Sequence, residues 1–76
     1  MTNQLITNLT DMGKYIQDVR KFKKMTQINT SESAKIAKGT LLHFEAGRRL
    51  PQGDNLFSIL VTLGIEMVLT VKEPEI

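Results

Sequence analysis

Apolar residues recur at helical spacing near the start of this chain. Met12, Ile16 and Val19 stand three or four positions apart, which places them on one face of a helix. The pattern predicts a helix over about 11–24. Residues 1–9 are mostly polar and predict an arm or a short extra turn before this helix.

Two short helices are predicted in the middle of the chain. Residues 27–33 are mostly polar and follow Thr26, a residue type that favours helix N-caps. Residues 38–46 precede Gly47, which is suited to ending a helix in the left-handed conformation. Residues 34–36 would form a tight turn, so this part of the chain has the order helix, turn, helix.

The hydrophobic period changes in the last third of the chain. Residues 56–63 predict a helix that Asp54 caps and Gly64 ends, because their apolar positions recur at helical spacing. Residues 65–73 are instead rich in strand-forming residues and predict a β-strand. The expected fold class is therefore all-α, with four or five helices in a core over 10–64 and one C-terminal strand.

Composition excludes several classes of protein. The chain has 76 residues, no Cys and one His, which predicts one small domain over 1–76 without a disulfide or a structural zinc site. It has no nucleophile motif and no phosphate-cradling Gly loop, so we expect no enzyme, no metal and no cofactor. No apolar run approaches a membrane span, and the start does not resemble a signal peptide. We expect a cytoplasmic, nucleoid-associated protein.

The charge is unevenly distributed along the chain. Residues 14–49 contain nine Lys or Arg and three Asp or Glu, which gives +6. The other residues contain one Lys and five Asp or Glu, which gives −4 and accounts for the overall net charge of +2. A basic face for nucleic acid and an ordinary solvated surface both fit this distribution.

Three short motifs stand at a characteristic spacing. Arg20 lies six residues before Thr26-Gln27, and Glu45-x-Gly47 begins nineteen residues after Thr26. This spacing resembles the lambda-repressor-like (Xre-type) helix-turn-helix family, and the match covers about residues 12–63 without a gap. The resemblance implies that the Arg20 guanidinium pairs with the Glu45 carboxylate as a structural ion pair, which would fix the second short helix on the first helix.

The sequence departs from the family pattern around the turn. Thr30-Ser31 replaces the usual Leu-Ala, Lys35 replaces the usual Gly, and Ala37 replaces the usual Ser or Thr. We therefore expect the first short helix to pack less tightly than in the family. The Lys35 backbone would either be strained or adopt another conformation.

The resemblance also implies which residues contact DNA. The second short helix would be the recognition helix in the major groove, with residues of the preceding helix and the following loop on the phosphates. The implied DNA-binding residues are Gln27, Lys38, Gly39, Thr40, His43, Arg48 and Arg49. Leu42 stands where the pattern usually has a polar residue, and two roles stay open for it: contact with a thymine methyl, or packing on residues 27–33.

An apolar pattern continues from the predicted last helix into the predicted strand: Leu56, Phe57, Ile59, Leu60, Leu63, Ile65, Met67 and Leu69. This pattern resembles HipB-type antitoxins, in which the last helix leads directly into a strand. The resemblance implies a homodimer that binds double-stranded DNA, represses its own toxin–antitoxin operon and partners a HipA-type kinase toxin.

A single strand leaves its backbone groups unpaired, and its one candidate partner within the chain, residues 4–7, is short. We therefore expect pairing with the same strand of a second copy. The resulting twofold dimer would bind an inverted-repeat operator. The predicted dimerisation residues are Met67, Val68, Leu69, Thr70 and Val71.

The predicted function is sequence-specific DNA binding by a transcriptional repressor, in the HipB-like antitoxin role. Two alternatives stay open. The chain could be a stand-alone phage or chromosomal Xre-type repressor. It could also be a helix-turn-helix module that binds a protein partner without binding DNA.

Overall fold

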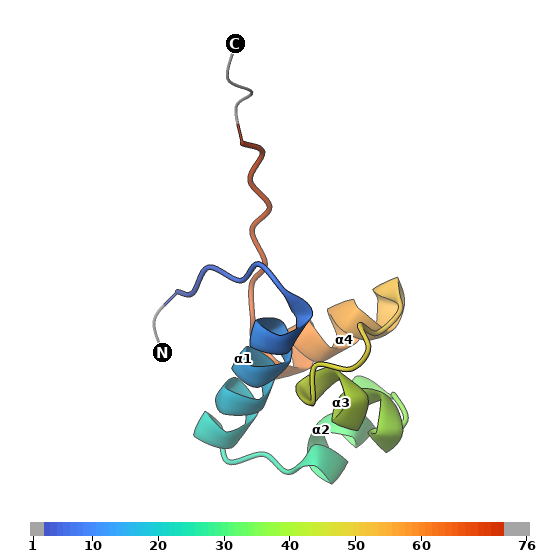
Figure 1. Ribbon diagram of the computed structural model, residues 1–76. Helices are drawn as coiled ribbons and strands as arrows, with labels where there is room; N and C mark the ends of the chain where they lie inside the picture. Colours follow the sequence, from blue (N-terminus) through green and yellow to red (C-terminus); the bar gives the residue numbers. More distant parts are fainter. Residues whose placement is uncertain (1–2, 73–76) are drawn as a thin grey trace.

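The computed structural model describes residues 3–72, which form four helices and no strand (Figure 1). The helices are α1 (Leu9–Phe22), α2 (Gln27–Ala34), α3 (Lys38–Glu45) and α4 (Gly53–Leu63). Helix α2 packs against both α3 and α4, and α1 packs against α3. The predicted all-α fold with a helix-turn-helix is confirmed.

The ends of the helices differ slightly from the sequence prediction. Helix α1 begins at Leu9 rather than at 11, because the Asn8 side chain caps it and accepts the N–H of Asp11 at 2.8 Å. It ends at Phe22 because Lys24 takes a left-handed conformation with φ 58°. Helix α4 begins at Gly53, so Asp54 lies in its first turn and is not its cap. A carboxylate in that turn is favourable next to the positive end of the helix dipole.

Helix α3 ends in the manner that Gly47 predicts, although its last helical residue is Glu45 and not Ala46. Gly47 has φ 71°, and its N–H donates to the Phe44 carbonyl at 3.0 Å. The next N–H, of Arg48, donates to the His43 carbonyl at 2.9 Å. These two hydrogen bonds form a Schellman motif, which fixes the direction of the chain as it leaves α3.

The core is formed where α1, α3 and α4 meet. Its fully buried side chains include Ile16 from α1, Leu41 and Phe44 from α3, and Ile59 and Leu63 from α4. Burying an aliphatic or aromatic side chain of this size contributes about 1.5–3 kcal/mol. The core therefore fixes one face of α3 inside the protein and leaves its opposite face outside.

Gly13 allows α1 to approach the end of α3 closely. A Cβ atom added at Gly13 would lie 2.2 Å from the Phe44 carbonyl oxygen and 2.9 Å from that of Glu45. Any side chain would force the two helices apart. The sequence pattern gave no signal for this contact, because a glycine inside a predicted helix does not reveal which backbone will approach it.

Helix α2 carries polar side chains into the interior. Thr30 is fully buried and Ser31 is 4% exposed. The Ser31 hydroxyl donates to the Ile28 carbonyl at 3.0 Å, whereas the Thr30 hydroxyl has no hydrogen-bond partner within residues 3–72. An unsatisfied buried polar group costs roughly 1–3 kcal/mol. The Thr30-Ser31 departure therefore places an unpaired hydroxyl in the interior. Looser packing of α2 stays a prediction.

We expect Thr30→Val to stabilise the protein. The substitution replaces the unpaired hydroxyl by a methyl group of similar shape, so the free energy of unfolding should rise by about 1 kcal/mol or more. In a domain of this size that corresponds to a melting temperature roughly 4–8 °C higher, measured by circular dichroism at fixed protein concentration.

The same substitution at Thr26 is the matched control. The Thr26 hydroxyl caps α2 by accepting the N–H of Asn29 at 3.0 Å. Thr26→Val should therefore lower the free energy of unfolding by about 1 kcal/mol. A Thr30→Val protein that melts below the parent would show that the hydroxyl has a favourable partner after all.

Candidate nucleic-acid interface

Helix α3 presents a distinct outward face to solvent. Lys38, Gly39, Leu42 and His43 are all exposed, whereas Leu41 and Phe44 on the other side are fully buried. Thr40 is half-buried and lies at the border between the two faces. The outward face of α3, meaning residues 38, 39, 42 and 43, brings together three of the four residues of this helix that the resemblance implies for DNA contact.

The N-terminus of α3 offers backbone donors. Its N-cap is Ala37, which has no side chain that could accept a hydrogen bond from the first turn. The first intrahelical bond is donated by Thr40 to the Ala37 carbonyl at 3.0 Å, so the N–H groups of Lys38 and Gly39 lie ahead of it. Free N–H groups and the positive end of the helix dipole both suit an anion such as a phosphate.

Lys35 adopts the backbone conformation that the turn requires, at the position where the family pattern has a glycine. It takes the left-handed conformation, with φ 58° and ψ 45°, at the C-cap of α2. Its N–H donates to the Glu32 carbonyl at 3.1 Å, and the N–H of Ile36 donates to the Ser31 carbonyl at 3.0 Å. The turn therefore has the conformation that a glycine would adopt easily, at a cost of roughly 1–2 kcal/mol for a lysine.

A buried ion pair ties α3 to α1. The Arg20 Nε donates to Glu45 Oε2 at 2.6 Å, and its Nη2 donates to Oε1 at 2.9 Å. Each residue is 7% exposed. The third guanidinium nitrogen, Nη1, donates to the Met25 carbonyl at 2.8 Å. Arg20 thus holds both the end of α3 and the connection between α1 and α2.

Gln27 joins the same network. Its Nε2 donates to Glu45 Oε1 at 3.2 Å, and the residue is half-buried at the start of α2. The resemblance implies a phosphate contact for Gln27. In the structure its amide is first of all oriented by Glu45, while its backbone N–H lies in the first turn of α2, where intrahelical acceptors are lacking.

Arg48 and Arg49 follow α3 directly and are exposed. Their N–H groups donate to the His43 carbonyl at 2.9 Å and 3.4 Å, which holds their backbone close to the end of the helix. The other basic residues are more scattered. Lys14 pairs with Asp18 at 3.2 Å, and the Lys23 ammonium donates to the Leu63 carbonyl at 2.5 Å.

The predicted dimerisation residues lie in an extended segment that leaves the helices (Figure 1). Met67 is 40% exposed, and Val68, Leu69 and Val71 are 80–91% exposed. Thr70 is exposed as well, and residue 73 lies outside the described residues. No backbone hydrogen bond joins this segment to residues 3–7 within the described part of the chain.

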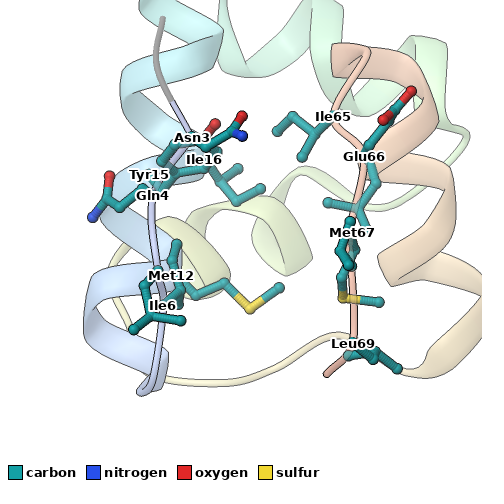
Figure 2. A pocket seen from close by; sticks show the side chains of 13 residues that line it. Asn3, Gln4, Ile6, Met12, Tyr15, Ile16, Ile65, Glu66, Met67 and Leu69 are labelled. Atoms are coloured by element: carbon teal, nitrogen blue, oxygen red, sulfur yellow. The ribbon is translucent and has the colours of Figure 1, made fainter. Parts of the chain in front are cut away.

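A hollow of about 390 Å³ separates the two extended segments (Figure 2). Asn3, Gln4 and Ile6 line one side of it, and Ile65 and Met67 line the other. Met12 and Leu60 contribute to its floor from α1 and α4. The sequence pattern did not predict that Ile6 and Met12 line this hollow, because it does not reveal which side of α1 the arm and the C-terminal segment approach.

The arrangement of α2, a tight turn and α3 with one outward face is that of a helix-turn-helix domain. Solved structures support this at the level of the whole fold. A HipB variant in complex with an O2 20mer has 24% sequence identity and a TM-score of 0.82, over 95% of this chain and 100% of that one. The HipA-HipB-O2-O3 complex gives 24% identity and a TM-score of 0.81, over 93% and 100% of the two chains.

A third solved structure is the restriction-modification controller protein C.AhdI from Aeromonas hydrophila. It has 21% identity and a TM-score of 0.71, over 76% of this chain and 88% of that chain. No protein-family model and no curated protein matches the sequence. These likenesses show that the chain has the same fold as HipB and C.AhdI, in agreement with the fold that the sequence resemblance implied.

Within 3–72, no group of three or more His, Cys, Asp or Glu could hold a metal ion. No helix in this range is long and apolar enough to cross a bilayer.

We expect Arg20→Ala to destabilise the fold strongly while changing sequence preference little. Removal of one partner leaves the Glu45 carboxylate buried and unpaired, which costs about 3–5 kcal/mol. Neither side chain lies on the outward face of α3. Thermal melting measures the loss of stability. The base preference of the variant is then measured at a temperature at which it is still folded.

Lys14→Ala is the control for a salt bridge of the exposed kind. Lys14 pairs with Asp18 at the surface, and such a pair is worth about 0–1 kcal/mol. If the melting temperature of Arg20→Ala were as close to that of the parent as the melting temperature of Lys14→Ala, the structural role of the buried pair would be contradicted.

Proposed function

We propose that this protein is a sequence-specific DNA-binding repressor that inserts α3 into the major groove. The observation that carries the proposal is the outward face of α3. It combines a lysine, a glycine and a histidine on a helix whose other side is fixed by the core and by Glu45. A rigid helix with an exposed, hydrogen-bonding face is what base recognition in the groove requires.

Each residue has a role that follows from its chemistry. Lys38 can donate to guanine O6 and N7, and His43 can donate to a base acceptor one turn further along. Thr40, at the border of the face, can contact a phosphate or a thymine methyl. Gly39 has no atom within 4 Å of the place where a Cβ would stand, so the backbone can approach the DNA closely there. Its absent side chain costs the helix about 1 kcal/mol relative to Ala.

Phosphate contacts would position the domain on the duplex. Arg48 and Arg49 are exposed immediately after α3, and Gln27 stands at the N-terminus of α2. Contacts of this kind carry little sequence information, but they release counterions and make binding salt-dependent. Helix α3 would therefore recognise bases, whereas Gln27, Arg48 and Arg49 would bind the DNA backbone.

A finer assignment is the HipB-like antitoxin role, in which the protein represses its own operon and binds a HipA-type kinase. The support is the likeness to HipB, which has been solved together with HipA and with O2. The protein would then act in the cytoplasm on nucleoid DNA. C.AhdI, a restriction-modification controller with the same fold, supports the alternative of a repressor without a toxin partner.

Lys38→Ala and Arg49→Ala should affect DNA binding in different ways. Lys38→Ala removes a base contact, so affinity for the preferred site should fall by about 1–3 kcal/mol and preference should relax at one position of each half-site. Arg49→Ala removes a phosphate contact, so all sequences should be bound more weakly and the salt slope should decrease by about 1. Binding of both proteins is measured over a salt series.

Lys14→Ala is again a suitable control, because Lys14 is engaged by Asp18 and lies on α1. If Lys38→Ala changes neither affinity nor preference, the proposed orientation of α3 on DNA is wrong. If the parent binds every duplex weakly and without salt dependence, the protein-interaction alternative is favoured over the repressor.

We further propose that the protein works as a homodimer closed by residues 66–71. The segment is extended, its apolar side chains are exposed, and its backbone groups have no partner in the described part of the chain. Pairing with the same segment of a second copy, antiparallel about a twofold axis, would satisfy the backbone groups and cover the apolar side chains. Met67 and Leu69 line the hollow together with Leu60, so the new surface would continue the core.

A twofold dimer sets the geometry of the operator. The two copies of α3 would be separated by about 34 Å, one turn of DNA, and each would recognise one half of an inverted repeat.

Deletion of 66–76 should convert the dimer into a monomer with much weaker operator binding. The helical core remains complete without these residues, because its buried side chains all come from α1 to α4. Analytical ultracentrifugation measures the mass, and circular dichroism shows whether the four helices persist. A truncated protein that still sediments as a dimer would refute the role of this segment, whereas Val61→Ala, a change at an exposed apolar residue of α4, should leave the dimer intact.

A further inference from the structure

The outward face of α3 contains one apolar side chain that the core does not use. Leu42 is 43% exposed, while Leu41 and Phe44 on either side of it are fully buried. Leu42 belongs neither to the buried core nor to the partly buried apolar side chains that pack against it. The core therefore does not require a leucine at this position.

Gly39 and Leu42 lie next to each other on this face. They lie three positions apart, so they are neighbours on the helix surface. Side chains of an α-helix lean toward its N-terminus, which directs the Leu42 side chain over the turn that contains Gly39. A Cβ at Gly39 would meet no atom within 4 Å, so the structure leaves open space beside the leucine. Gly39 adds no side chain to this face, so the hydrocarbon side chain of Leu42 is not covered from the N-terminal side.

The chemistry of the exposed Leu42 side chain selects one group of the major groove. Leucine neither donates nor accepts hydrogen bonds, so it gains nothing from the N7, O6, O4 or amino groups of the base edges. The thymine C5-methyl is the apolar group that the bases present there. Lys38, four positions before Leu42, is placed to donate to a neighbouring acceptor base.

We propose that Leu42 is a specificity-determining residue that recognises a thymine by contact with its C5-methyl group, in the space that Gly39 leaves open. The inference rests on the proposed function, because it requires α3 to lie in the major groove. It goes further by naming the base, the atom and the side chain that discriminates it.

The test uses the full chain and removes one methyl group at a time from the DNA. A preferred site is first selected from a pool of random duplexes. Each thymine of that site is then replaced by deoxyuridine, in both half-sites together, and dissociation constants are measured by fluorescence anisotropy at constant salt. Loss of one buried methyl corresponds to about 0.8 kcal/mol, which is roughly fourfold in affinity for each half-site.

Two variants separate direct contact from other effects of deoxyuridine. With Leu42→Ala, the penalty at the critical thymine, which is roughly fourfold for each of the two half-sites, should disappear. The side chain and the methyl would then be energetically coupled. Val61→Ala, at a residue that is 79% exposed on α4, should keep the full penalty. Both variants should melt near the parent temperature, since each changes an exposed side chain.

Two results would overturn the inference while leaving the proposed function intact: a selected site in which no thymine shows a methyl-dependent affinity, and a penalty that persists unchanged in Leu42→Ala. A pool from which no sequence is enriched would instead contradict the proposed function itself, and the inference with it.

Discussion

The ion pair between Arg20 and Glu45 is the interaction on which the rest of the structure depends. A carboxylate in the last turn of α3 is unfavourable next to the negative end of the helix dipole, and its burial would be costly if it were unpaired. The Arg20 fork removes both problems with two hydrogen bonds, and its third nitrogen holds the Met25 carbonyl. One guanidinium therefore positions α3, the start of α2 and the connection between α1 and α2 relative to each other.

The position of α3 decides what the surface can do. Leu41 and Phe44 anchor one side of the helix in the core, and Gly13 brings α1 against its C-terminal end. The opposite side is then presented to solvent as a rigid face rather than as a mobile one. Such rigidity matters for recognition in a groove, because a side chain that is already held in place loses less conformational entropy on binding.

The polar interior of α2 has a different consequence. Thr30 occupies a fully buried position with an unpaired hydroxyl, and Lys35 occupies a left-handed position that glycine would fill with less strain. Both features make the helix-turn-helix less stable than its geometry alone would allow. A small domain with this weakness gains more than most from additional buried surface, which is what the exposed extended segment after Ile65 could supply in a second copy.

The sequence by itself determined the order of the helices, the turn between α2 and α3, and the end of α3 at Gly47, because these follow from local periodicity and backbone preference. The spacing of Arg20 and Glu45 was informative only through its resemblance to a family. The tertiary structure decided which faces meet: that Gly13 admits a carbonyl, that Gln27 donates to Glu45, and that Leu42 remains outside the core. Contacts between residues far apart along the chain depend on the packing of whole helices, and a one-dimensional pattern does not contain that information.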